Sequence, residues 1–280
     1  MVDAAPRFQD QAHIFLRSLL ATGVLPAHIH AHLTPGAARA QDTLVAALTA
    51  YGVVLHNLEP FLDGAYCNKL VQLDSLPLGD AECVALCDTD LAFLTGLEAA
   101  ASADVVRAKP VDMPNPAIAF LEMARDICGL RGTPRLVRTS CADAETWVSN
   151  CNGGLYLLPC ALAPEIGARW KHHAATLYAA RERFARHFRN VDQMSFAMAM
   201  LDLGMDVDPL AAEDNFPLHL SARFAPDADI LPRVLHFHWL HNGSESLLAT
   251  GHPGIDRAVE AVNAILERHR RIPVLDERKR

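Results

Sequence analysis

The chain has 280 residues, of which 51% are hydrophobic and 21% charged, and a formal net charge of −8. This composition indicates a soluble globular protein, and the negative charge argues against a nucleic-acid partner. The seven cysteines form no C-x-x-C motif and follow no signal peptide, so we expect a cytoplasmic protein. No apolar stretch approaches the ~20 residues that span a bilayer, so we expect no transmembrane segment.

Strands and helices are expected to alternate along the chain, which predicts an α/β fold with an open, mainly parallel sheet flanked by helices. We find no internal repeat and no linker, and expect a single domain over 1–280. Its core covers about 8–240, and a C-terminal helix with a basic tail covers 254–280. Hydrophobic periodicity and turn residues predict helices at 7–23, 38–50, 65–73, 116–128, 164–188, 194–203 and 254–269, and strands at 27–33, 53–55, 83–87, 105–110, 155–159 and 234–239.

An apolar run at 83–87 ends in two carboxylates, Asp88 and Asp90. The run predicts a buried strand, and burying an unpaired carboxylate inside such a layer is costly. Both aspartates should therefore lie just past the carboxyl end of the strand, where open α/β sheets place their ligands. In extended chain, residues i and i+2 point to the same side, so the two carboxylates can converge on one hard cation such as Mg²⁺ or Mn²⁺. The alternative is a strand exit with two solvated aspartates.

Histidines alternate along the predicted strand at 27–33, at positions 28, 30 and 32. They all face the side opposite Ile29 and Leu33, and no cysteine or carboxylate lies nearby in the sequence. We therefore expect a half-exposed strand here and no metal site.

Further polar motifs follow in a fixed order. Asn68 and Lys69 precede the strand that ends in Asp88-Thr89-Asp90, and Asn152-Gly153-Gly154 forms a turn before an apolar strand. Asp192 and Gln193 open the helix at 194–203, where Asp192 is also well placed to cap the helix. His236-Phe237-His238 comes last. In this order and spacing, the sequence resembles the GT-A-fold glycosyltransferases, most closely the glycogenin and galactosyltransferase-like group called family eight, over roughly residues 8 to 240.

The resemblance implies a role for each motif. Asp88 and Asp90 correspond to the D-x-D motif, which holds a divalent ion, usually Mn²⁺ (or Mg²⁺), against the diphosphate of a nucleotide sugar. His236 corresponds to the late histidine that completes the metal sphere, with His238 as the neighbouring alternative. The donor-binding residues implied are Lys69, Asp88, Asn152, Gly153 and Gly154, and the catalytic residues implied beside the anomeric carbon are Asp192 and Gln193.

Two departures from the family pattern bear on activity. The family begins with a nucleotide-binding strand, and only residues 1–6 precede the first predicted helix, so this strand is expected to be missing or severely shortened. The family also often has a glycine and then Lys-Pro-Trp after the late histidine, whereas this chain continues as Trp239-Leu240-His241.

The resemblance implies a metal-dependent glycosyltransferase that moves a sugar from a nucleoside-diphosphate donor, most simply UDP-linked, to an unidentified acceptor with retention of configuration. The alternative from another class is a catalytically impaired relative that acts as a binding or assembly module. A third possibility, a phosphohydrolase with Asp88 as nucleophile, is disfavoured because the strand lacks the pattern, downstream Lys and acidic pair that such enzymes need.

Overall fold

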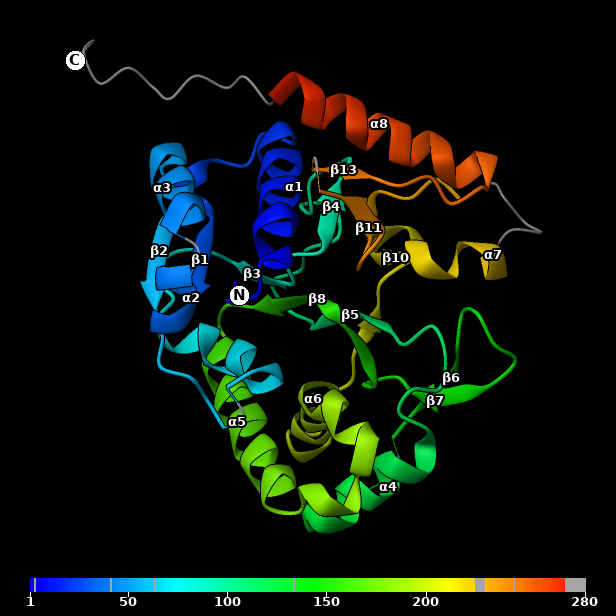
Figure 1. The fold of residues 1–280 in the computed structure, drawn as a ribbon. Helices are drawn as coiled ribbons and strands as arrows, with labels where there is room; N and C mark the ends of the chain where they lie inside the picture. Colours follow the sequence, from blue (N-terminus) through cyan, green and yellow to red (C-terminus); the bar gives the residue numbers. More distant parts are fainter. Residues whose placement is uncertain are drawn as a thin grey trace. The chain divides into compact units, whose positions relative to one another are not determined.

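The structure is a computed structural model that describes residues 1–2, 4–40, 42–62, 64–132, 134–224, 230–243 and 245–269 (Figure 1). The predicted basic tail beyond residue 269 lies outside these residues. The chain folds into two compact units, each made of segments that are distant in sequence. The first unit comprises Met1–Glu59, Asp88–Ala99 and Ala212–Arg280, and the second comprises Pro60–Cys87 and Ala100–Ala211. The single-domain organisation over 1–280 stays a prediction.

The first unit contains two small sheets that matter for function. Strands β1 and β2 pair in parallel, and β11 lies between β10, which is parallel to it, and β4, which is antiparallel. Helix α1 packs on β4, where the Phe15 and Phe93 rings meet edge to face at 5.2 Å. The elements of this unit are α1 (Arg7–Ala21), η1 (Pro26–His28), β1 (His30–Leu33), α2 (Pro35–Ala40), α3 (Asp42–Tyr51), β2 (Val54–Asn57), β4 (Leu91–Phe93), η5 (Ala212–Asn215), β10 (Phe216–Pro217), η6 (Leu218–Leu220), α7 (Ser221–Phe224), β11 (Val234–His236), β12 (His241–Asn242), β13 (Ser246–Leu247) and α8 (Pro253–His269).

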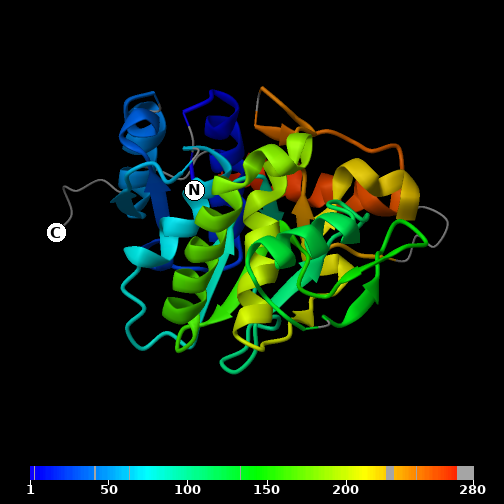
Figure 2. The same ribbon diagram turned by 90° about the horizontal axis from the view of Figure 1, so that it is seen from below.

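The second unit is built on a four-stranded sheet in the order β3-β8-β5-β9. Helices α5 and α6 lie side by side (Figure 2). Tyr156 of β8, Trp170 of α5 and Phe196 of α6 form an aromatic cluster with ring centroids 4.4–5.1 Å apart, so the core lies between the sheet and these helices. The elements are η2 (Tyr66–Asp74), β3 (Cys83–Cys87), β5 (Arg107–Pro110), α4 (Ile118–Ile127), β6 (Leu136–Arg138), β7 (Glu145–Trp147), β8 (Cys151–Pro159), α5 (Ala163–Ala179), η3 (Arg181–Arg183), η4 (Ala185–Asn190), α6 (Val191–Asp202) and β9 (Asp208–Pro209).

Several details differ from the sequence-based expectation. The sheets are mixed rather than mainly parallel, because the long strand β8 runs antiparallel to both β3 and β5. The long helix expected over 164–188 ends at Ala179, and the Arg-rich segment after it forms two short 3-10 helices instead. Gly153 and Gly154 lie within β8 rather than in a turn before it.

The first strand is expected to be missing or severely shortened, and the structure does not show it to be missing. Val2 forms a one-residue parallel bridge with Leu33 of β1, its N–H donates to the His32 carbonyl at 2.9 Å, and its side chain is buried. Of the helices in the described residues, none is long and apolar enough to cross a membrane.

Candidate metal centre and donor-site residues

Strand pairing in the first unit brings Asp90 next to His236. Leu91 of β4 pairs with His236 of β11, and the Phe237 N–H donates to the Asp90 carbonyl at 2.9 Å, which extends the ladder by one step. The Asp90 Oδ1 and His236 Nε2 atoms consequently lie 3.3 Å apart. Two residues far apart in sequence thus meet because both stand at the end of neighbouring strands.

His238 joins this pair through an unusual backbone conformation. In an extended strand, residues i and i+2 are too far apart for their rings to stack, since each residue advances the chain by about 3.3 Å. His238 has a φ of +52°, in the left-handed region that few non-glycine residues adopt. The strand ends there, and the His238 ring stacks on the His236 ring with centroids 3.8 Å apart and planes 12° apart. This conformation turns His238 back toward Asp90.

The three side chains form a possible metal site. One ligand atom from each of Asp90, His236 and His238 lies within 4.8 Å of the other two, and in the described part of the chain no other group of three His, Cys, Asp or Glu residues meets this criterion. The His236 side chain is 5% exposed and that of Asp90 is 19% exposed, so an ion here would be largely shielded from water but reachable by a ligand.

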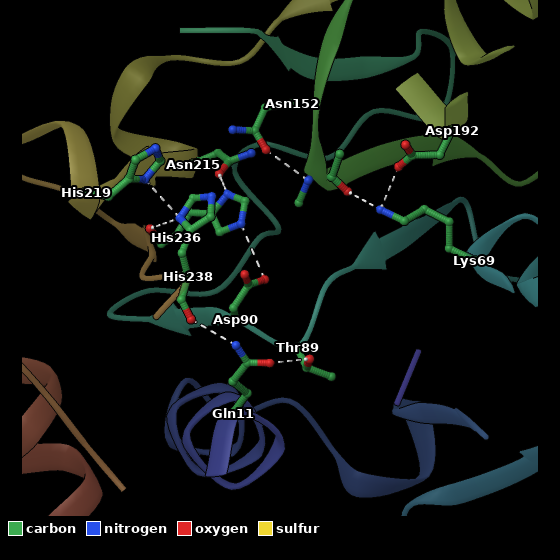
Figure 3. Close-up of polar contacts among 12 residues, drawn as sticks. Gln11, Lys69, Thr89, Asp90, Asn152, Asp192, Asn215, His219, His236 and His238 are labelled. Carbon is green, nitrogen blue, oxygen red and sulfur yellow. Dashed lines mark hydrogen bonds and ion pairs between the residues drawn. The ribbon is translucent and has the colours of Figure 1, made fainter. Parts of the chain in front are cut away.

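A hydrogen bond orients the His236 ring toward Asp90. The Asn215 Oδ1 lies 3.1 Å from His236 Nδ1, and because an amide oxygen only accepts, Nδ1 must donate to it (Figure 3). This contact leaves His236 Nε2 directed at the Asp90 carboxylate, 3.3 Å away. An ion bound by both groups would replace their direct contact, and Asn215 would then be the outer support that ligating histidines usually have. The donor set therefore fits a metal.

The protonation states also suit metal binding. Burial would raise the pKa of Asp90, but His236, by charge and hydrogen bond, and His238, by charge, lower that pKa overall, so the carboxylate stays ionised. Burial, followed by the charge of His236, lowers the pKa of His238 to about 3. His238 is therefore a neutral imidazole at neutral pH, which is the form that coordinates metals.

Gln11 of α1 connects the two segments that carry the metal ligands. Its Nε2 donates to the His238 carbonyl at 2.9 Å, and its Oε1 accepts from the Thr89 hydroxyl at 3.3 Å (Figure 3). Gln11 is only 5% exposed, so these bonds are shielded from water. One side chain thus holds the residue that precedes Asp90 and the strained backbone of His238 in fixed positions.

The sequence-based ligand set agrees with the structure in part. Asp90 and His236 lie together as expected, and His238, which the sequence offered as an alternative to His236, lies with both. Asp88 is not one of the three grouped residues, so its role toward a metal and a donor stays a prediction. The sequence analysis missed Gln11 and Asn215, which carry no motif and become recognisable only through contacts made by the fold.

In the second unit, Lys69 and Asp192 form a buried ion pair. The Lys69 Nζ lies 3.1 Å from Asp192 Oδ2 and donates to the Gly153 carbonyl at 3.2 Å (Figure 3). The two side chains are 17% and 8% exposed. Three of the residues that the family resemblance implicates, from η2, β8 and α6, therefore come together in this unit.

Gly153 leaves room for this close packing. A Cβ atom at this position would lie 3.1 Å from both Asp192 Oδ2 and Lys69 Nζ, and 3.6 Å from Gln193 Nε2. The first two distances are tighter than ordinary van der Waals contact, so a side chain would press on the ion pair. Next to it, Asn152 Oδ1 accepts the Gly154 N–H at 3.0 Å, which places the Asn152 amide beside the same strand segment.

Asp192 is held by its surroundings rather than acting as a helix cap. The first residue of α6 is Val191 and the capping position belongs to Asn190, so the capping role considered for Asp192 is wrong. The buried Trp170 indole N–H donates to the Asp192 carbonyl at 2.8 Å. The adjacent Gln193 Oε1 is buried and accepts no hydrogen bond within the described part of the structure, so it is available to a ligand.

Comparison with known proteins agrees with the architecture. No family model matches the sequence, and no curated protein sequence is significantly similar to it. Among solved structures, the galactosyltransferase LgtC in complex with donor and acceptor sugar analogues matches with a TM-score of 0.53 and 15% identity over 94% of this chain and 95% of that one. An active-site variant of LgtC matches with a TM-score of 0.54 and 13% identity over 94% of each chain.

The glycosyltransferase GlyE of Streptococcus pneumoniae TIGR4 matches with a TM-score of 0.51 and 13% identity, over 95% of this chain but only 62% of that one. These similarities extend over almost the whole of this chain. At identities of 13–15% they are evidence of a shared fold only. This chain therefore has the α/β fold of the family-eight, GT-A-type glycosyltransferases.

Proposed function

We propose that this protein is a metal-dependent glycosyltransferase that moves a sugar from a nucleoside-diphosphate donor, most simply UDP-linked, to an acceptor. The observation that carries the proposal is the grouping of Asp90, His236 and His238 within a fold of this kind. A carboxylate oxygen and two imidazole nitrogens fit Mn²⁺ better than Mg²⁺, because Mg²⁺ strongly prefers oxygen ligands.

The chemistry requires charge compensation at the departing diphosphate. A bound divalent ion would offset the negative charge that develops there as the sugar–phosphate bond breaks. Asp90 contributes an ionised carboxylate, kept so by its histidine neighbours. His236 contributes Nε2, which the Asn215 contact at Nδ1 directs toward the site. In this proposal Asp88 binds the donor and the ion from the other half of the D-x-D motif.

The second unit supplies groups suited to the sugar. As its bond to the diphosphate breaks, the sugar becomes oxocarbenium-like and is stabilised by nearby oxygens with negative charge. We assign this role to the Asp192 carboxylate and the Gln193 Oε1. Lys69 offsets the cost of holding the Asp192 carboxylate buried and ionised. Asn152, Gly153 and Gly154 border the sugar in this assignment, and the proposed product retains the anomeric configuration.

Cellular location and partners are part of the same proposal. All seven cysteines are free thiols in the structure, consistent with the cytoplasmic address expected from the sequence. The partners proposed are the nucleotide-sugar donor and a sugar acceptor, with no role for nucleic acid given the formal net charge of −8.

A second candidate is a catalytically impaired relative that serves as a binding or assembly module. The observation that favours it is that Asp88, the first residue of the expected D-x-D pair, stands outside the grouped ligands. Such a protein would keep the fold without turning over a donor.

The two candidates are separated by a turnover assay. The purified chain is incubated with Mn²⁺ and a panel of UDP-, GDP- and ADP-sugars, and release of free nucleoside diphosphate is followed with and without a mixture of simple acceptors. Asp90→Asn is compared with Asp104→Asn, an exposed aspartate of the second unit, as the matched control. We expect metal-dependent release that only Asp90→Asn abolishes. Turnover that survives Asp90→Asn contradicts the proposal, and the absence of turnover with every donor favours the binding module.

A further inference from the structure

A second cluster of histidines lies in the first unit, on the two-stranded parallel sheet formed by β1 and β2. The register aligns His32 of β1 with His56 of β2, and His30 stands two residues before His32 on the same strand face. The His30 and His56 rings are 5.0 Å apart, and the His32 ring stacks on the His56 ring at 4.6 Å with planes 17° apart. None of these residues belongs to the Asp90 cluster.

Two ring nitrogens in this cluster already stand close to metal-binding distance. His30 Nδ1 lies 2.8 Å from His56 Nε2. Two imidazole nitrogens bound to one ion at about 2.0–2.1 Å each, at angles between square and tetrahedral, lie about 2.9–3.4 Å apart. Rotation of both rings until their lone pairs converge on one point, with a shift of a few tenths of an ångström, would therefore convert a hydrogen-bonded pair into a chelating pair.

The surroundings keep both imidazoles in the form that binds metals. Burial lowers the pKa of His30, which the charges of His56 and His28 lower further, and burial also lowers the pKa of His56. Both rings are half-buried rather than sealed, so an ion from solvent can reach them. His28 is exposed in the adjoining 3-10 helix η1, and its charge acts on His30.

We propose that His30 and His56 form a second metal site, which binds a borderline divalent transition ion such as Zn²⁺ with water in the remaining positions. All of its protein donors are imidazole nitrogens, which suit Zn²⁺, Cu²⁺ and Ni²⁺ rather than Mg²⁺ or Mn²⁺. The ion would cross-link β1 to β2, two strands of four residues each that, among the residues the structure describes, otherwise pair only with one another and with Val2. The sequence led us to expect no metal here because His56, the residue that completes the pair, comes from another strand.

The test measures Zn²⁺ binding by titration calorimetry in a background variant that carries Asp90→Asn, His236→Gln and His238→Gln, so that none of the three grouped side chains holds the ion. We expect this variant to bind one Zn²⁺ and to gain thermal stability from it. Adding His56→Gln should weaken binding at least tenfold and remove the stability gain, whereas adding His172→Gln, at an exposed histidine of the second unit, should change neither.

The possible outcomes are separable from those of the proposed transferase function. Unchanged Zn²⁺ affinity after both His56→Gln and His30→Gln overturns the second site, as does the absence of Zn²⁺ binding in the background variant. Circular dichroism of each variant without metal confirms that the fold is intact. A chain without any donor turnover can still bind Zn²⁺ at His30 and His56. The Zn²⁺ titration therefore remains interpretable if the transferase proposal fails.

Discussion

Replacing Gln11 with methionine tests whether the buried amide of α1 positions the metal ligands. Methionine is of similar length and fills the same space, but it can neither donate to the His238 carbonyl nor accept from the Thr89 hydroxyl. The substitution therefore removes the connection between the two ligand-bearing segments without changing any ligand. Gln9→Met is the matched control, because Gln9 lies on the same helix and makes an exposed hydrogen bond to Thr43.

The size of the effect follows from burial and hydrogen bonding. Each lost hydrogen bond contributes about 0.5–1.5 kcal/mol, and a buried partner left unsatisfied costs about 1–3 kcal/mol. With Gln11 5% exposed and Thr89 8% exposed, water replaces neither contact well. We expect a loss of about 2–3 kcal/mol in unfolding free energy, where each kcal/mol corresponds to about 2–4 °C in Tm for a protein of this size. Loss of an outer contact to a metal site should also weaken metal binding about 10–100-fold.

Two measurements decide the matter. Thermal unfolding without metal reports the stability loss, and Mn²⁺ titration followed by electron paramagnetic resonance reports the affinity of the site. We expect Gln11→Met to lower both and Gln9→Met to lower neither. If Gln11→Met loses stability but binds Mn²⁺ as tightly as Gln9→Met, Gln11 supports the fold and does not position the metal ligands, and the reasoning is refuted.

Three further predictions concern other contacts. In a urea titration, Lys69→Met should cost about 3–5 kcal/mol in unfolding free energy, since it leaves the Asp192 carboxylate buried without its partner. Lys171→Met, which breaks a more exposed ion pair, should cost at most about 1 kcal/mol in the same titration. Gly153→Ala should displace the ion pair by a few tenths of an ångström and weaken donor binding in calorimetry while Mn²⁺ binding persists; unchanged donor affinity would place the sugar elsewhere. Asp256→Asn should lower Tm at neutral pH. Burial acts to raise the pKa of Asp256, but hydrogen bonds from the 250–251 segment lower this pKa overall. The ionised Asp256 carboxylate therefore stabilises the fold fully above the unfolded pKa of about 3.9, and this stabilisation is lost as pH falls through the lower folded pKa. A Tm difference that persists unchanged at pH 2 would argue against this origin.

Local sequence signals predicted the elements well where one rule decided the outcome. The apolar run at 83–87 is a strand that ends before the two aspartates, and the amphipathic helix expected at 254–269 is α8, Pro253–His269. Local rules failed where pairing with a strand distant in sequence determines the conformation. Nothing in 152–154 distinguishes a turn from a strand until β8 is seen to extend between β3 and β5, and the antiparallel course of β8 has no local signature.

The candidate site shows the same limit. His236 and His238 attract attention through their spacing, but their convergence on Asp90 depends on the pairing of β4 with β11 and on the left-handed backbone at His238. The three residues of β4 gave no signal of a strand, because so short an apolar segment fits many conformations. Gln11 and Asn215 support the site through tertiary contacts alone, so no pattern in a single sequence singles them out.

The central claim is that Asp90 and its histidine neighbours hold an ion that binds a nucleoside diphosphate. The most direct measurement is thermal unfolding with UDP, with and without Mn²⁺, on the unaltered chain and on Asp90→Ala. A ligand at ~100 times its dissociation constant adds about 2.7 kcal/mol, which raises Tm by several degrees. We predict a Tm increase that requires UDP, Mn²⁺ and Asp90 together. An equal increase in Asp90→Ala, or none in the unaltered chain with any nucleoside diphosphate, would contradict the account.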